Sequence, residues 1–131
     1  DRNFGFGHVA DDTKRANAAV HAALDAGFAA ARPGAKMKEV WAAMWKIMED
    51  FGALGNSIGR MGHGLGMLLT EWPSVHPEDE RVLEAGVVMT LEPGMTFAPG
   101  RQLVHEENIV ITEDGAEYLT RRAPPDIPVI S

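Results

Sequence analysis

The sequence has 131 residues, and it contains no cysteine and only one tyrosine. The absence of cysteine excludes disulfides and thiolate metal sites, so any bound metal must be held by histidine, aspartate or glutamate. It also favours a cytoplasmic location, because disulfides belong mainly to oxidising compartments.

Basic residues are few: 12 Lys and Arg against 19 Asp and Glu give a formal net charge of -7. Nucleic-acid-binding proteins need clustered Lys and Arg, whereas the basic residues here are scattered, so we expect no nucleic-acid partner. The sequence also lacks an apolar run approaching the roughly 18 residues of a membrane span. We therefore expect no membrane partner.

The hydrophobic residues that are present, 45% of the chain, suffice for the core of one domain. The chain begins at Asp1 with the run Asp-Arg-Asn-Phe-Gly-Phe-Gly, which is typical of a strand entering a turn and not of a natural start. We therefore expect residues 1–131 to be part of a longer protein.

Two helices are predicted in the first half of the chain. Asp11 and Asp12 are candidate N-caps of the first helix, which Pro33–Gly34 must end. The second helix is predicted from Lys36 to Phe51. Its apolar residues recur at intervals of three and four and form one stripe that is expected to face the core: Met37, Val40, Trp41, Met44, Met48 and Phe51.

The second half of the chain is predicted to form strands. One strand covers 87–92, before Pro93–Gly94, and another covers 103–112 as a single run. The residues 113–115, Glu-Asp-Gly, supply a turn into a further run at 117–120. Two helices followed by several strands predict an α+β fold.

Three segments carry polar side chains that suggest chemistry. His63 lies in Gly-His-Gly-Leu-Gly, where the glycines let the backbone pack tightly while the imidazole faces a cavity. Glu92 ends an apolar strand, where a carboxylate is costly to bury without a cation. The third segment, His-Glu-Glu-Asn at 105–108, interrupts a strand of Leu, Val and Ile. Taken alone, a histidine is more often structural or solvent-facing than a ligand, and the first glutamate could equally be a turn residue.

Strand alternation separates the two adjacent glutamates of the third segment. Glu106 shares a face with Val104 and Asn108, whereas Glu107 shares the other face with His105 and Ile109. Only one glutamate can therefore point at a given site, and periodicity alone does not decide which one.

The three segments, in this order, resemble the C-terminal signatures of the pita-bread-fold metallopeptidases, which include Xaa-Pro aminopeptidases, prolidases and creatinase: GHGLG, LEPG and HEENIVIT. The similarity extends through the paired helices and the Glu-Asp-Gly turn. It implies that residues 1–131 are the C-terminal portion of one catalytic domain, with two helices packed on a mainly antiparallel, curved sheet.

The resemblance also implies a metal centre. In that family two divalent ions are held by two aspartates, one histidine and two glutamates; His63, Glu92 and Glu106 match the last three. Glu107 and His105 then face away. The ions implied are Mn²⁺, with Co²⁺, Zn²⁺ or Fe²⁺ as alternatives. The implied reaction is attack of a metal-activated water on an amide bond, with His63 and Glu92 as catalytic residues and Glu92 as the proton carrier.

The two aspartate ligands are expected before Asp1. The family pattern Asp-x-Thr-Arg-Thr-Phe matches its last four residues to Asp1–Phe4, so Asp1 is not expected to be a ligand. With three of five ligands, this chain alone is expected to bind metal poorly and to be inactive.

The substrate is less defined. Thr70, Glu71 and Trp72 stand where the family places substrate contacts, but Thr70 replaces a usual histidine, and Val104 replaces an arginine of aminopeptidase P. These departures leave open, beside a small peptide, a non-peptide substrate as in creatinase, ectoine hydrolase or dimethylsulfoniopropionate lyase. Trp72 could line such a pocket as a cation–π partner or simply cover the core.

A further alternative is a non-catalytic binding module of the same fold. Such relatives have generally lost metal ligands, so the retention of His63, Glu92 and Glu106 argues against it. The resemblance also implies a homodimer in the full-length protein.

Overall fold

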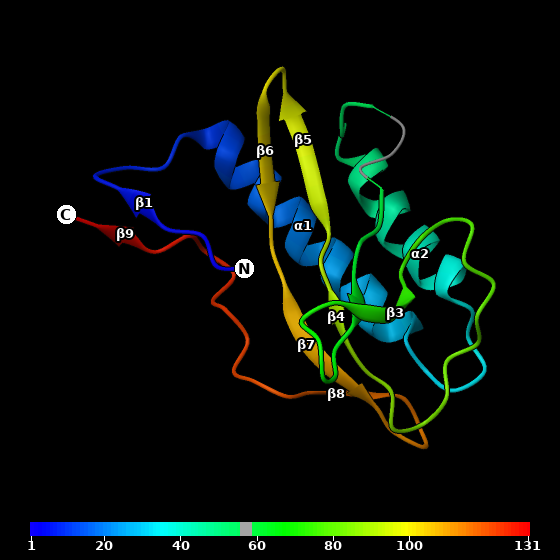
Figure 1. Ribbon diagram of the computed structural model, residues 1–131. Coiled ribbons are helices and arrows are strands. Elements are labelled where there is room, and N and C mark those ends of the chain that lie inside the picture. Colours follow the sequence, from blue (N-terminus) through cyan, green and yellow to red (C-terminus); the bar gives the residue numbers. More distant parts are fainter. Residues whose placement is uncertain (56–58) are drawn as a thin grey trace.

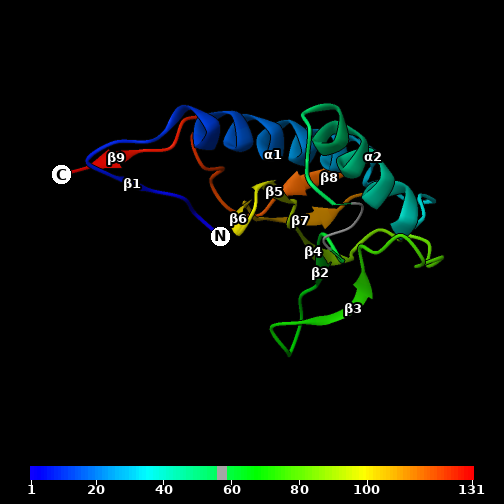
Figure 2. The same cartoon turned by 90° about the horizontal axis from the view of Figure 1, so that it is seen from above.

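The computed structural model describes residues 1–55 and 59–131. Two helices, α1 (Asp11–Ala30) and α2 (Met37–Asp50), cover one face of a sheet (Figures 1 and 2). The main sheet has the strand order β3-β2-β4-β7-β8, and its neighbours pair antiparallel. Its strands are β2 (His63–Gly64), β3 (Glu71–Ser74), β4 (Val88–Leu91), β7 (Glu107–Ile111) and β8 (Ala116–Tyr118). The predicted α+β fold, with two helices on a mainly antiparallel sheet, is confirmed.

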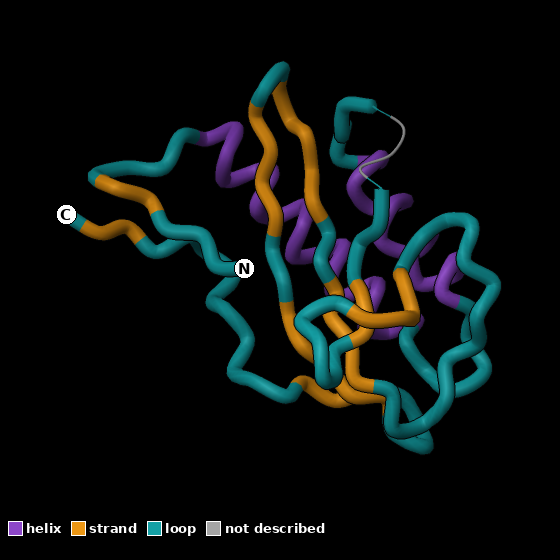
Figure 3. The backbone as a smooth tube through the Cα atoms, in the orientation of Figure 1, coloured by secondary structure: helices purple, strands orange, loops and turns teal. Residues whose placement is uncertain are grey.

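Two smaller sheets complete the chain. The strands β5 (Gly94–Ala98) and β6 (Arg101–Val104) form an antiparallel hairpin, and β1 (Gly5–Phe6) pairs in parallel with β9 (Val129–Ile130). The β1–β9 pair projects to one side of the molecule (Figure 3). Among the described residues, no helix combines the length and apolar character that a membrane span requires.

The helix α1 forms because its alanine-rich sequence has high helix propensity, and its buried face allows close packing. At Gly27 a β-carbon would lie 2.7 Å from the Met44 side chain, so glycine here lets α2 approach. The predicted N-caps are wrong: Ala10 occupies the N-cap without a side-chain cap. Asp11 and Asp12 instead lie in the first turn, where their charges favour the helix dipole.

The helix α2 buries the predicted apolar stripe, with one exception. Its buried residues are Met37, Val40, Trp41, Met44 and Met48. The exception is Phe51, which we expected in the core and which is 50% exposed. It occupies the C-cap, one residue beyond the helix, where the chain leaves the helical path before Gly52 at a φ of 84°. The stripe therefore ends before Phe51 because the helix does.

The predicted single strand 103–112 is interrupted in the structure. It forms β6 and β7, and its antiparallel partner is likewise divided into β4 and β5, a continuation that we did not predict. The register is the same on both sides of the gap: Leu91 pairs with Glu107, and Gly94 pairs with Val104. The backbone N–H of His105 donates to the Pro93 carbonyl at 3.2 Å across the gap. Proline lacks an N–H and so breaks the ladder here.

Candidate metal centre

His63, Glu92 and Glu106 come together at this break in the ladder. One ligand atom from each residue lies within 4.8 Å of the others. Glu92 directly follows β4, Glu106 directly precedes β7, and His63 lies on β2, the neighbour of β4. Within residues 1–55 and 59–131, this is the one group of three or more such side chains with that spacing. Three segments, in which Glu92 follows His63 by 29 residues and Glu106 follows Glu92 by 14, therefore build a single cluster of one imidazole and two carboxylates.

Glycines set the position of His63, as the sequence predicted. A β-carbon on Gly62 would lie 2.2 Å from the Thr90 carbonyl oxygen, and one on Gly64 would lie 2.4 Å from the Trp72 carbonyl oxygen. Both neighbours of His63 must therefore be glycine for β2 to fit between β4 and β3. The backbone N–H of His63 also donates to Thr90 Oγ1 at 3.0 Å, which holds the two strands together.

The hydrogen bonding of the His63 ring defines which nitrogen is available. Its Nδ1 lies 3.0 Å from the Gly64 carbonyl oxygen, and a carbonyl can only accept, so Nδ1 carries the proton. In the neutral ring Nε2 then keeps its lone pair, and Nε2 lies 3.8 Å from Glu92 Oε2. A backbone carbonyl that fixes the tautomer in this way is a usual companion of a metal-binding histidine.

The two carboxylates of the cluster are partly open to solvent. The side chains of Glu92 and Glu106 are 27% and 22% exposed. The Asp1 amino nitrogen lies 3.0 Å from Glu106 Oε2, so the beginning of the chain borders the site. The Glu92 backbone N–H donates to the Met61 carbonyl at 2.9 Å and ties the end of β4 to the segment before β2. The donor set fits a divalent cation, which would offset the repulsion between the two carboxylates.

Glu107 points to the opposite face, as the resemblance implied. Its side chain has no exposed area and accepts hydrogen bonds from Arg2, His105 and the Ala123 N–H. Burial alone would raise the pKa of Glu107, but the hydrogen bonds from Ala123, His105 and Arg2 outweigh it and hold that pKa below its ordinary value. Glu107 is therefore an ionised carboxylate matched by partners within the protein.

His105 lies on the same face as Glu107. Its ring is 2% exposed and packs 4.3 Å, centroid to centroid, from the His21 ring on α1. Burial lowers the pKa of His105 despite the neighbouring Glu107, so the ring is neutral near pH 7 and its Nε2–H donates to the carboxylate. The contact between Glu107 and Arg2, which are 105 residues apart, was not predicted from the sequence. The only signal for it was a carboxylate on the buried face of the strand, which requires a partner.

The three predicted substrate contacts lie together at the edge of the sheet. Thr70, Glu71 and Trp72 line a cavity of about 200 Å³ with Arg60 and Ser74. The Glu71 Oε1 accepts the Leu68 N–H at 2.7 Å and so shapes the loop before β3. Contact of these residues with a substrate remains a prediction.

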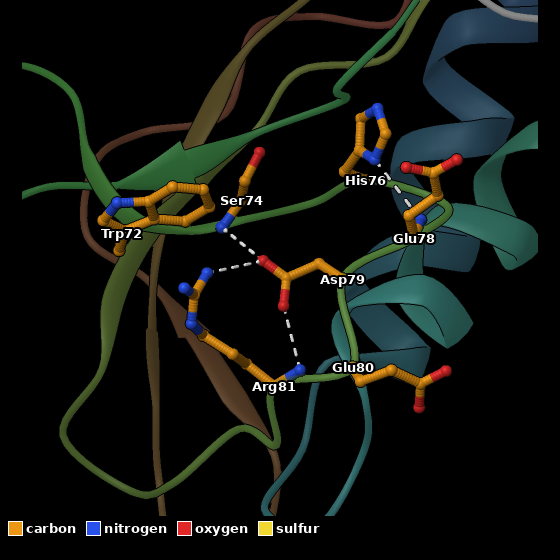
Figure 4. Close-up of a pocket in the computed structure, with 7 residues that line it drawn as sticks. All are labelled: Trp72, Ser74, His76, Glu78, Asp79, Glu80 and Arg81. Carbon is orange, nitrogen blue, oxygen red and sulfur yellow. Dashed lines mark hydrogen bonds and ion pairs between the residues drawn. The ribbon is translucent and has the colours of Figure 1, made fainter.

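Trp72 does not cover the core, which was the alternative interpretation of this residue. Its side chain is 70% exposed and borders a second, open cavity of about 730 Å³ (Figure 4). The Arg81 guanidinium lies 4.0 Å from the centroid of the Trp72 ring, and Asp79 Oδ2 holds Arg81 Nη1 at 3.0 Å. A cation–π partner therefore already lies over one face of this ring.

Comparisons with known proteins identify the family of this chain. The profile of metallopeptidase family M24 matches residues 1–113. The Xaa-Pro dipeptidase of Pyrococcus furiosus is 37% identical over 92 residues, which cover 70% of this chain and 26% of that protein. The crystal structure of dipeptidase PepE from Mycobacterium ulcerans is 32% identical with a TM-score of 0.88 and covers 98% of this chain and 34% of its own.

A third relative is the X-Pro aminopeptidase of Thermotoga maritima, 27% identical with a TM-score of 0.87 over 98% of this chain and 36% of that one. The chain thus spans about a third or less of the length of these three relatives. Most of its own length lies within the matched profile, and its fold is that of the prolidases and dipeptidases. The chain belongs to metallopeptidase family M24.

Proposed function

We propose that this chain supplies three ligands of a two-metal peptidase of the Xaa-Pro dipeptidase type. The observation that carries the proposal is the convergence of His63, Glu92 and Glu106 within 4.8 Å in a member of a metallopeptidase family. The relatives named as Xaa-Pro dipeptidase and dipeptidase support a peptide substrate. Bound divalent ions, which we propose to be Mn²⁺, would polarise the substrate carbonyl and activate a water molecule.

The roles of the three residues follow from their surroundings. His63 would offer Nε2, because its Nδ1 proton is held by the Gly64 carbonyl. Glu106 would hold the metal together with His63 and Glu92. Glu92 is assigned to carry a proton toward the leaving nitrogen, since its carboxylate borders His63 and remains partly open to solvent.

Two aspartate ligands would have to come from residues before Asp1 in a longer protein. Arg2 Nη1 donates to the Glu106 carbonyl at 2.6 Å, so residues shortly before it would lie near this ligand. This position supports the proposed five-ligand centre. A homodimer and a cytoplasmic location are proposed on the resemblance alone, and light scattering and cell fractionation of the full-length protein test them.

Metal analysis of the full-length protein tests the proposal. We expect about two divalent ions per chain in the wild type, and fewer in variants with His63→Ala or Glu106→Ala, with loss of Xaa-Pro dipeptide hydrolysis. Glu117→Ala is the matched control, because it removes an exposed glutamate of the neighbouring strand β8. Unchanged metal content and turnover in both site variants would refute the proposal and favour a binding module.

A second candidate keeps the metal centre but changes the substrate to a small non-peptide molecule. It is favoured by Thr70, which replaces the histidine of related peptidases, and by Val104. Wild type and Thr70→His would be compared on Xaa-Pro dipeptides, creatine, ectoine and dimethylsulfoniopropionate, with Leu69→His as the control on the same exposed loop. Turnover of a non-peptide by the wild type, with Xaa-Pro turnover only in Thr70→His, would establish this second function.

A further inference from the structure

We propose that Glu107 is a positioning residue that holds the metal ligand Glu106 in place through the contacts of its own buried carboxylate. We define the Glu107 cluster as Arg2, His21, His105 and Glu107. The inference rests on the proposed function, since it concerns the ligand Glu106. It adds a role for residues on the face of the strand opposite the metal centre.

Glu106 belongs to neither β6 nor β7, so its own backbone lies outside the regular pairing of the sheet. The partner strand holds only its two neighbours: the His105 N–H donates to the Pro93 carbonyl, and Glu107 pairs with Leu91. The Arg2 guanidinium compensates for this: its Nη1 donates to the Glu106 carbonyl at 2.6 Å, and its Nη2 donates to Glu107 Oε2 at 2.9 Å. One planar side chain therefore fixes the ligand's own carbonyl and the neighbouring residue together.

The Glu107 carboxylate in turn joins three parts of the chain. Its Oε2 binds Arg2 from the beginning of the chain, and its Oε1 accepts the Ala123 N–H at 2.9 Å from the C-terminal segment. The same oxygen lies 3.1 Å from His105 Nε2, and the His105 ring packs against His21 on α1. Both neighbours of Glu106 in sequence are thus anchored to the scaffold, which restricts where the Glu106 side chain can point.

Both acceptor oxygens of Glu107 are needed for this arrangement. In Glu107→Gln one of them becomes an NH₂, which meets a donor in either orientation of the amide: Arg2 Nη2 in place of Oε2, or the Ala123 N–H in place of Oε1. Either donor–donor contact displaces the side chain, and the hold of Arg2 on the Glu106 carbonyl would weaken. Changes to groups that orient metal ligands typically reduce metal affinity by about 10–100-fold.

A purely structural role for Glu107 is the competing explanation, because Glu107 also holds the C-terminal segment at Ala123. Asn17 provides the matched control: its Nδ2 holds the same segment at the Pro125 carbonyl, at 2.6 Å. Asn17→Ala removes this hold on the segment while the contacts of the Glu107 cluster remain. The two explanations predict different effects of these substitutions on metal affinity.

The experiment compares wild type, Glu107→Gln and Asn17→Ala in the full-length protein. Mn²⁺ affinity is measured by calorimetry, thermal stability without metal by circular dichroism, and amide exchange of residues 105–107 without metal by mass spectrometry. We expect Glu107→Gln to lower Mn²⁺ affinity at least tenfold and to speed exchange at 105–107. Asn17→Ala should lower thermal stability while leaving both of these quantities unchanged.

Several results would overturn the inference. Wild-type Mn²⁺ affinity in Glu107→Gln, or equal losses of affinity in Glu107→Gln and Asn17→Ala, would leave only a structural role. If Glu107→Gln does not fold, Arg2→Lys is measured in its place, because lysine keeps the charge but cannot bind both acceptors as arginine does. Wild-type Mn²⁺ affinity in Arg2→Lys would also overturn the inference. A wild type that binds no Mn²⁺ would instead refute the proposed function, and the exchange measurement would still test the anchoring of Glu106.

Discussion

Glu106 and Glu107 are adjacent in sequence and lie on opposite faces of the same chain segment. The Glu106 side chain is 22% exposed and lies beside His63 and Glu92, where two carboxylates meet one imidazole. Glu107 is fully buried on the face toward α1, where Arg2, His105 and the Ala123 N–H match its charge. The comparison shows that surroundings decide the role of a glutamate: one is satisfied by the protein, whereas the other remains available to a cation.

The largest expected effect is at the metal face, which we define as His63, Glu92 and Glu106, in contrast to the helix face, the side of the sheet that α1 and α2 cover. Removal of metal by a chelator, or Glu106→Ala, should reduce peptide hydrolysis by the full-length protein to the uncatalysed background, because both remove what polarises the carbonyl. Hydrolysis should return when Mn²⁺ is added to the chelated wild type but not to the variant. Activity in the continued presence of chelator would contradict the assignment.

Within the metal face, Glu92→Gln should have a different signature. The amide can still occupy the site but cannot carry a proton, so kcat should fall by about 10²–10⁴-fold while part of the metal content is retained. Steady-state kinetics together with metal analysis of the same sample measure both quantities. If the folded Glu92→Gln variant retained no metal at all, the result would support a role for Glu92 as a ligand and would not support its role as the proton carrier.

On the helix face, a core substitution should affect stability and leave the chemistry intact. Met44→Ala on α2 removes a fully buried side chain that contacts Gly27, and it should lower the free energy of unfolding by about 2–5 kcal/mol. Denaturant unfolding measures the loss, and Mn²⁺ affinity of the folded variant should equal that of the wild type. A matching loss of affinity would show that the two faces are coupled through the helix layer.

The smallest expected effect concerns pH. Burial, together with the neighbouring His105 and Arg122, lowers the pKa of His21 below its ordinary value. The unfolded state then binds the proton more readily than the folded state, so His21 contributes stability above its unfolded pKa of about 6.5 that is lost as pH falls toward the folded pKa. Chemical denaturation between pH 7 and 5 should show a decline that His21→Gln weakens. An identical pH dependence in both proteins would remove His21 as the cause.

The helices were predictable because their signals are local. The apolar spacing of α2 located its start and end to within one residue and its buried face correctly, except at Phe51, where the helix ends. The N-cap was predicted one or two residues too late, at Asp11 or Asp12, because the helix begins after Ala10, which has no capping side chain to mark the start. The division of 103–112 into β6 and β7 was not foreseeable, since it depends on Pro93 in the partner strand.

The sequence by itself determined the candidate ligands: the motifs around His63 and Glu92 and the alternation that separates Glu106 from Glu107 are all local. Only the tertiary structure decided that these side chains meet, since the meeting depends on the order of β2, β4 and β7 in the sheet. It also decided that Arg2 neutralises Glu107, a contact across 105 residues. The physical reason is that local periodicity sets which way a side chain points, whereas its partners are set by how distant segments pack.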